Sequence, residues 1–222
     1  MLFRSSRPEK GDWLEYLFNL MDLTSFDSFR ATPVRFITYN YDRRIEERIS
    51  NGLRGRFRAS DLQVATFWEA RPVIHLHGSV GSLTHGPTFV PYGALTNEAP
   101  IDFAIRGCIE RAASGVRVVH QADAQSFEFQ QARALLREAA RVIFLGFSFG
   151  ETNVDRLGLQ NIQPGAVVIC SRFGMTDVEA ELAIQTPFQK MRLARVGLGK
   201  QEEDCRELLR NHQHSFVTRY SA

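Results

Sequence analysis

Short apolar runs that alternate with helical patterns constrain the fold of this chain most. The five clearest runs are rich in β-branched and aromatic residues and span residues 34–38, 73–77, 116–120, 142–146 and 166–170, with a weaker sixth at 191–196. Residues 142–146 (V-I-F-L-G) and 166–170 (A-V-V-I-C) lack the polar alternation of a half-exposed strand, which indicates burial on both faces. The pattern therefore predicts an α/β fold in which helices cover both faces of one parallel sheet.

Helical patterns fill the intervals between these runs. Asp42 is expected to cap a helix that has Glu46 and Glu47 in its first turns and that ends at Gly52. Three more helices are expected over residues 127–141, from Thr176 or Asp177 to Gln185, and over about 201–213.

Composition narrows the class of protein. With 222 residues, 44% of them hydrophobic, the sequence predicts a single domain over 1–222. A net charge of +2 is too small to indicate nucleic-acid binding. Cys108, Cys170 and Cys205 form no C-x-x-C pair, so neither a disulfide framework nor a zinc site is expected, and a reducing compartment such as the cytoplasm fits. Residues 12–23 predict an amphipathic helix, and no run approaches the roughly 20 apolar residues of a membrane span.

A long segment that departs from the alternating strand and helix pattern follows the second run. Residues 78–100 contain four glycines and three prolines, and the whole excursion is expected to occupy 78–115 with loop and helix. Loops of that length in a compact domain are usually functional or disordered.

Three strand ends carry small or hydrogen-bonding residues. They are T-Y-N-Y-D at 38–42, H-L-H-G-S at 75–79 and G-F-S-F-G-E-T-N at 146–153. Because ligands of open parallel sheets bind beyond the carboxyl ends of the strands, we expect these segments to converge on a surface crevice.

In this order and spacing the three motifs resemble those of the SIR2 (sirtuin-like) family, in particular its bacterial SIR2-like branch. The resemblance covers roughly residues 30–175 and implies a Rossmann-like, SIR2-like NAD-binding architecture. It implies that Asn40 and His77 are catalytic: Asn40 lies by the nicotinamide ribose and positions water, and His77 acts as general base. It implies that Asp42 recognises the nicotinamide carboxamide.

The resemblance also implies a set of further cofactor contacts at the strand ends. These are Thr38, Gly78, Gly146, Phe147, Ser148, Asn153 and, after the run at 166–170, Ser171.

Two departures from the family pattern shape the expected activity. No glycine-rich turn precedes Thr38, and Gly11 is the one earlier glycine, so either the domain is shortened at its N-terminus or it lacks that half of the cofactor site. The paired-cysteine zinc module of deacylating sirtuins is absent as well. The resemblance then implies NAD glycohydrolase activity, yielding nicotinamide and ADP-ribose, with a role in bacterial anti-phage defence and a homo-oligomer or partner subunit. The alternative is a catalytically inactive nucleotide-binding or protein-interaction module of the same fold.

Several of these residues also have a purely structural interpretation. Asn40 and Asp42 also suit a strand-end turn and a helix cap. His75 and His120 can be interpreted as core or edge histidines whose hydrogen bonds are satisfied. G-L-G-K at 197–200 can be interpreted as an ordinary turn. We expect no metal site, and neither His75 with His77 nor His212 with His214 is expected to share one.

Overall fold

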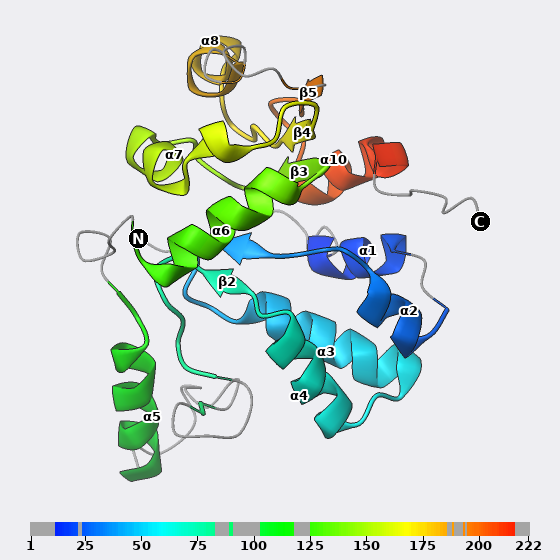
Figure 1. The fold of residues 1–222 in the computed structure, drawn as a ribbon, viewed down its shortest axis with the longest axis vertical. Helices are drawn as coiled ribbons and strands as arrows, with labels where there is room; N and C mark the ends of the chain where they lie inside the picture. Colours follow the sequence, from blue (N-terminus) through cyan, green and yellow to red (C-terminus); the bar gives the residue numbers. More distant parts are fainter. Residues whose placement is uncertain are drawn as a thin grey trace.

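The structure is a computed structural model that describes residues 12–21, 24–82, 89–90, 103–117, 125–185, 188, 193 and 195–215. It has the mixed α/β class that the sequence predicts (Figure 1). The strands are β1 (Ile37–Thr38), β2 (Ile74–His75), β3 (Arg141–Phe144), β4 (Val167–Cys170) and β5 (Arg195–Leu198). The α-helices are α1 (Trp13–Leu20), α2 (Phe26–Ala31), α3 (Arg44–Phe57), α4 (Asp61–Ala70), α5 (Phe103–Ser114), α6 (Phe127–Glu138), α7 (Glu151–Leu157), α8 (Asp177–Ala180) and α10 (Cys205–Asn211).

All strand pairs in the two ladders are parallel, but the described strands form two sheets rather than the single sheet expected. One sheet pairs β1 with β2 in the register Ile37 to Ile74, and the other has the order β3-β4-β5. Of the run expected at 116–120, Val116 makes an antiparallel bridge to Gly78, and residues 118–120 lie outside the described part. The weak run at 191–196 overlaps β5 at its end.

Side chains rather than a hydrogen-bonded ladder join the two sheets. Helix α6 lies between them in Figure 1, and its Phe129 is completely buried in one hydrophobic core. That core also holds Ile74 and Leu76 from the first sheet region and Phe144 and Val168 from the second. In the described residues the single sheet expected from the sequence is thus two sheets, and the ring contact of Tyr39 with Phe147 links the segments that follow β1 and β3.

Helices α1 to α4 enclose a second core beside the first sheet. Its central residues are Phe18, Phe29, Ile49, Leu53, Phe67 and Trp68. The indole Nε1 of Trp68 donates to the Ser50 hydroxyl at 2.9 Å, so the polar atom of this ring is satisfied inside the core.

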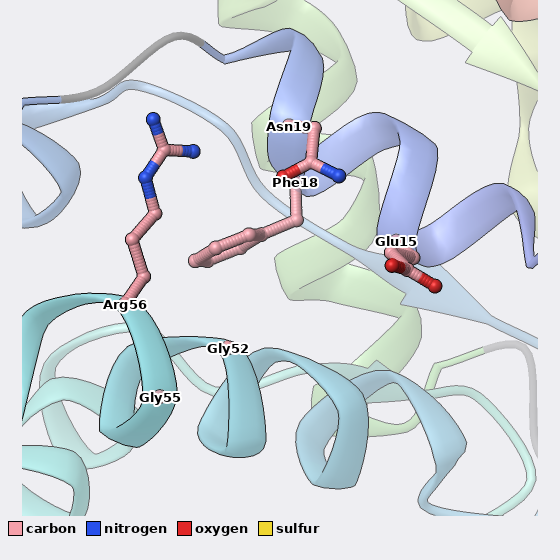
Figure 2. A pocket seen from close by; sticks show the side chains of 6 residues that line it. All are labelled: Glu15, Phe18, Asn19, Gly52, Gly55 and Arg56. Carbon is pink, nitrogen blue, oxygen red and sulfur yellow. The ribbon is translucent and has the colours of Figure 1, made fainter.

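Helix α3 passes through Gly52, where the sequence predicts its end, and stops only before Arg58 at φ 52°. The reason is helix packing: a Cβ on Gly52 would lie 3.0 Å from the Phe18 ring. Figure 2 shows Phe18 reaching from α1 toward this part of α3. The glycine therefore permits close approach of two helices instead of terminating one.

The other helix boundaries follow local capping. Thr176 caps α8 through a reciprocal capping box with Glu179, and the helical path continues as a π-helix through Gln185, as expected. Asp204 caps α10 in the same way, so this helix starts later than the expected 201. The helix expected to reach 141 stops at Glu138, because the chain enters β3 at Arg141.

No helix within the described residues is both long and apolar enough to cross a membrane. This finding applies to the described ranges alone.

Asp12 fastens α1 to α3. Its carboxylate accepts from the Leu14 N–H at 2.9 Å, from Arg48 Nε at 2.7 Å and from Arg44 Nη2 at 3.3 Å, and its side chain is only 6% exposed. Burial acts to raise the pKa of Asp12, but the hydrogen bonds from Leu14, Arg48 and Arg44 outweigh burial and hold the pKa below its usual value.

We predict that Asp12→Ala lowers the free energy of unfolding by about 1–2 kcal/mol at neutral pH, chiefly through the lost helix cap. A lowered pKa means that the carboxylate stabilises the fold above its unfolded pKa near 3.8, and that this stability is lost as the pH falls through the folded pKa. Urea unfolding should therefore show the difference from wild type shrinking in acid.

Asp61→Ala is the matched control, because Asp61 also pairs across two helices, with Arg54 at 2.9 Å, but its side chain is 88% exposed. An exposed pair contributes about 0–1 kcal/mol. Equal losses for the two variants, or an Asp12 effect that does not change with pH, would contradict the assignment.

Candidate functional site

Tyr39 brings the three predicted strand-end segments together. Its ring stacks on Phe147 with centroids 5.5 Å apart and lies 5.3 Å from the His77 ring. Its hydroxyl donates to the Asn153 carbonyl at 2.7 Å. Each of the three motifs therefore contributes at least one residue to this contact cluster, although β3 belongs to a different sheet from β1 and β2.

His77 lies inside the cluster and is only 3% exposed. The rings of Tyr39, Tyr41 and Phe129 surround it at centroid distances of 5.3, 6.3 and 6.1 Å. The expectation of a surface position is thus wrong for His77, because rings from distant parts of the chain cover it. Burial, and then the charge of Arg156, lower the pKa of His77, which favours the neutral imidazole.

The Nδ1 atom of His77 is buried and has no hydrogen-bond partner among the described residues. A buried polar atom without a partner is unusual, because its lost hydration is not replaced. The cluster therefore contains a ring nitrogen whose hydrogen-bonding capacity the described part of the fold does not use.

Asn40 is exposed at the end of β1, and the structure gives its side chain no hydrogen bond to a described residue. Its backbone is fixed on both sides: the N–H donates to Thr38 Oγ1 at 3.0 Å, and the carbonyl accepts from His75 Nδ1 at 2.8 Å. The turn thus presents the amide of Asn40 on a constrained backbone. Thr38, a predicted cofactor contact, acts here on the turn itself.

Asp42 acts as a helix cap in this structure. Its Oδ1 accepts from the Arg44 N–H at 3.0 Å, although the N-cap position itself belongs to Arg43. The carboxylate is exposed and turned to the start of α3. This contact corresponds to the plainer of the two interpretations of Asp42.

Gly146 and Ser171, both predicted cofactor contacts, meet each other. The Gly146 N–H donates to Ser171 Oγ at 2.7 Å, and the Ser171 N–H donates to the Phe144 carbonyl at 2.9 Å. Ser171 is 3% exposed, whereas Gly146 and Ser148 are exposed. Ser171 therefore supports the turn after β3 from the protein interior. Of the two serines, Ser148 is the exposed one.

Gly78 lies where the two ends of the excursion over residues 78–115 pack against each other. Its φ is 79°, and a Cβ there would lie 2.0 Å from the Gly115 carbonyl oxygen. The neighbouring His77 carbonyl accepts from the Arg117 N–H at 2.8 Å. Within the excursion, residues 83–88 and 91–102 lie outside the described ranges.

Sequence reasoning missed several residues that build this site. Tyr39 and Tyr41 stand inside the quoted T-Y-N-Y-D motif, and their alternation with Asn40 was an available signal for rings beside the polar residues. Glu46 was assigned to the helix dipole, yet its Oε1 lies 2.8 Å from His75 Nε2. The expectation of a satisfied buried His75 is confirmed by this bond and by the bond to Asn40.

A hollow on another face of the molecule contains none of the predicted residues. It has a volume of about 510 Å³ and opens between α1 and α3, as Figure 2 shows. Its lining consists of Glu15, Phe18, Asn19, Gly52, Gly55 and Arg56. One ring, two glycines and three polar side chains line it, which is not the mostly apolar lining typical of a cofactor site.

The remaining motifs resolve into structural roles. In G-L-G-K the Lys200 N–H donates to the carboxylate of Glu203 at 3.0 Å, a contact that agrees with an ordinary turn. Burial raises the pKa of the Cys170 thiol, in keeping with an inert cysteine. No group of three or more His, Cys, Asp or Glu residues in the described ranges is arranged to hold a metal ion.

No protein-family model, no curated protein and no solved structure matches this chain. The fold and the site define its class by themselves: a mixed α/β protein in which a buried histidine and an exposed asparagine follow two neighbouring parallel strands.

We predict that Gly78→Ala destabilises the protein more than Gly146→Ala. Both glycines have positive φ, 79° and 64°, so each alanine incurs about 1–2 kcal/mol of left-handed strain. At Gly146 no atom lies within 4 Å of the added Cβ, whereas at Gly78 the added Cβ overlaps the Gly115 carbonyl. Urea unfolding of both variants measures the difference, and a loss at Gly146 as large as at Gly78 would show that the close approach to Gly115 does not constrain the fold.

Proposed function

We propose that this chain is a SIR2-like NAD-processing domain that hydrolyses NAD to nicotinamide and ADP-ribose. The observation that carries the proposal is the contact cluster of Tyr39, His77 and Phe147, because it gathers the three motifs that resemble the family. The proposal includes a SIR2-like architecture over a single domain, which goes beyond the α/β class.

The reaction makes few demands on a protein. The bond between the ribose C1′ and the nicotinamide nitrogen breaks, and its electron pair neutralises the charged pyridinium ring. Water attacks C1′ and gives up a proton, through an oxocarbenium-like transition state. The protein must orient the ribose and the water and accept that proton.

His77 and Asn40 suit these two tasks. An imidazole with a lowered pKa is neutral at physiological pH and can accept a proton, and the unused Nδ1 of His77 is a candidate acceptor. The exposed amide of Asn40 offers both a donor and an acceptor without adding charge.

Access to His77 requires one of its covering rings to move. Tyr41 is half-buried, and its hydroxyl donates to the Arg117 carbonyl at 3.3 Å, a long bond. Tyr39, by comparison, is fixed by a shorter bond and a ring stack. Displacement of Tyr41 is therefore the least costly way to open the cluster to a substrate.

The remaining predicted contacts keep their proposed roles as partners of the NAD molecule. Ser148 and Gly146 are exposed beside half-buried Phe147, and Asn153 lies in the first turn of the following helix. Thr38, Asp42, Gly78 and Ser171 belong to the same proposed contact set. A cytoplasmic role in anti-phage defence, with a homo-oligomer or partner subunit, stays part of the proposal and follows from the resemblance.

The buried position of His77 favours a second candidate. A domain whose general base is covered could bind a nucleotide, or another protein, without cleaving NAD. This inactive module and the hydrolase differ in turnover, so one assay separates them.

We predict that His77→Asn and Asn40→Ala each reduce nicotinamide release by about 10²–10⁴-fold, the usual effect of losing a general base or its positioned water. Chromatography of nicotinamide at millimolar NAD measures the rate, and circular dichroism checks the fold. His214→Ala is the control, because His214 is exposed in the short helix at Gln213–Ser215.

Two outcomes would count against the hydrolase. Variants as active as wild type would remove His77 and Asn40 from the mechanism. A wild-type chain that binds ADP-ribose without any NAD turnover would favour the inactive module.

We also predict that this chain binds NAD weakly, with a Kd above about a millimolar. Without a glycine-rich turn the pyrophosphate lacks two or three charge-assisted hydrogen bonds of roughly 1.5–3 kcal/mol each. Their loss amounts to about 3–9 kcal/mol, or roughly two to six decades in affinity. Calorimetry tests this expectation, and a micromolar Kd would mean that another segment, such as the excursion after Gly78, recognises the phosphates.

A further inference from the structure

His75 is held between two hydrogen-bond acceptors. Its Nδ1 lies 2.8 Å from the Asn40 carbonyl oxygen, and its Nε2 lies 2.8 Å from Glu46 Oε1. The ring is 9% exposed, so water does not compete freely for either contact. A carbonyl and a carboxylate both accept, so making both bonds requires two protons shared by the imidazole and its carboxylate partner.

Loss of one of these protons cannot leave both bonds intact. The remaining ring proton can face the Glu46 carboxylate or the Asn40 carbonyl. A charge-assisted hydrogen bond is roughly twice as strong as a neutral one, so the proton stays toward Glu46. The Nδ1 lone pair then faces the lone pairs of the Asn40 carbonyl, and the contact to Asn40 becomes repulsive.

His75 contacts the backbone carbonyl of Asn40, the residue whose side-chain amide is proposed to be catalytic. The Asn40 backbone has two fixed points, the bond to Thr38 Oγ1 and the bond to His75. Glu46 belongs to the first turn of α3, so the His75 ring ties the segment after β1 to that helix as well as to its own strand β2. Removing the His75 bond frees the half of the turn that carries the Asn40 side chain.

We propose that His75 is a positioning residue whose imidazolium clamps the Asn40 carbonyl to Glu46, and that release of one proton from this clamp loosens Asn40 and switches the site off in alkaline solution. The proposal rests on the proposed function for its effect on activity, but the protonation of the clamp is independent of that function.

The charged groups around His75 agree with this geometry. Burial lowers the pKa of His75, but the hydrogen bond and charge of Glu46, the Asn40 carbonyl and the charge of Asp42 outweigh burial, so the pKa lies above its usual 6.5. Glu46 approaches from α3, and Asp42 approaches from the loop before it. The pKa of His77, two residues later, is shifted in the opposite direction.

The two shifts define a window of pH. His77 must be neutral to accept a proton, so activity rises as the pH passes its lowered pKa. His75 must be charged to hold Asn40, so activity falls as the pH passes its raised pKa. The pH profile of kcat/KM, which reports the free protein, should be bell-shaped with its optimum between the two values.

The profile of Glu46→Gln tests the clamp. A glutamine amide donates to the unprotonated Nε2 of a neutral ring. Nδ1 then stays protonated and donates to the Asn40 carbonyl, although the imidazole carries no charge. Wild type should lose about tenfold in kcat/KM per pH unit on the alkaline side, and Glu46→Gln should lose that limb while keeping the acid limb of His77. Glu47→Gln is the matched control, because it removes the same charge one residue further along α3 and should keep the wild-type profile. An alkaline limb that persists in Glu46→Gln overturns the proposal.

Nitrogen-15 NMR of labelled histidine separates this proposal from the proposed function. At pH 6.5, the usual histidine value, the His75 ring should be mostly doubly protonated and the His77 ring mostly neutral. Signals are assigned by their loss in His75→Gln and His77→Asn. A neutral His75 ring at that pH overturns the clamp whatever the activity, whereas a charged ring in a protein without NAD turnover supports the clamp and removes only the hydrolase.

Discussion

The stack of Tyr39 on Phe147 is the contact on which the rest of the site depends. The β1–β2 ladder is two residues long, and so short a pair is not stable by itself. Tyr39 anchors the end of that ladder to the turn after β3 through its ring and through the hydroxyl bond to Asn153. An aromatic pair contributes about 0.5–1.5 kcal/mol beyond its buried area. Without this contact the polar residues after β1 and β3 have no fixed relation to one another.

The two histidines of H-L-H show how far neighbours decide the chemistry of a side chain. Strand β2 ends at His75, and the chain turns before His77, so the two rings reach different surroundings. His75 has an oxygen acceptor at each ring nitrogen, whereas His77 is enclosed by three aromatic rings and has a buried nitrogen without a described partner. Both are buried to a similar degree. Burial lowers the pKa of both, so hydrogen bonds to the charged form and the sign of the nearby charges distinguish them.

Local sequence signals predicted the parts of the fold that depend on near neighbours. The run at 142–146 covers all of β3 except its first residue, and the run at 166–170 contains β4; the two strands pair with Val142 opposite Val168. The cap at Thr176 formed as expected, because it needs only residues within one turn. The prediction that a helix ends at Gly52 was wrong. Phe18 of another helix packs where a side chain at position 52 would lie, so the glycine serves packing.

The same distinction explains the candidate site. The order of strands, turns and polar residues could be predicted because each motif is continuous in the sequence. The burial of His77 could not, because Phe129 reaches it from α6 and Tyr41 reaches it from the end of another strand. Long-range aromatic packing has no local pattern, so only the folded chain reveals it.

The turn after β3 shows that this packing also fixes the local backbone. Phe149 has a φ of 53°, a conformation that costs a bulky residue of the order of 1–3 kcal/mol. Its side chain is 5% exposed and packs against Phe144, Phe147 and Phe188. Burial of a phenylalanine contributes about 1.5–3 kcal/mol, enough to offset the strain. Ser148 lies between Phe147 and Phe149 in the sequence, and it is exposed while Phe149 is buried and Phe147 stacks on Tyr39, so the core determines which residue of this turn the site presents.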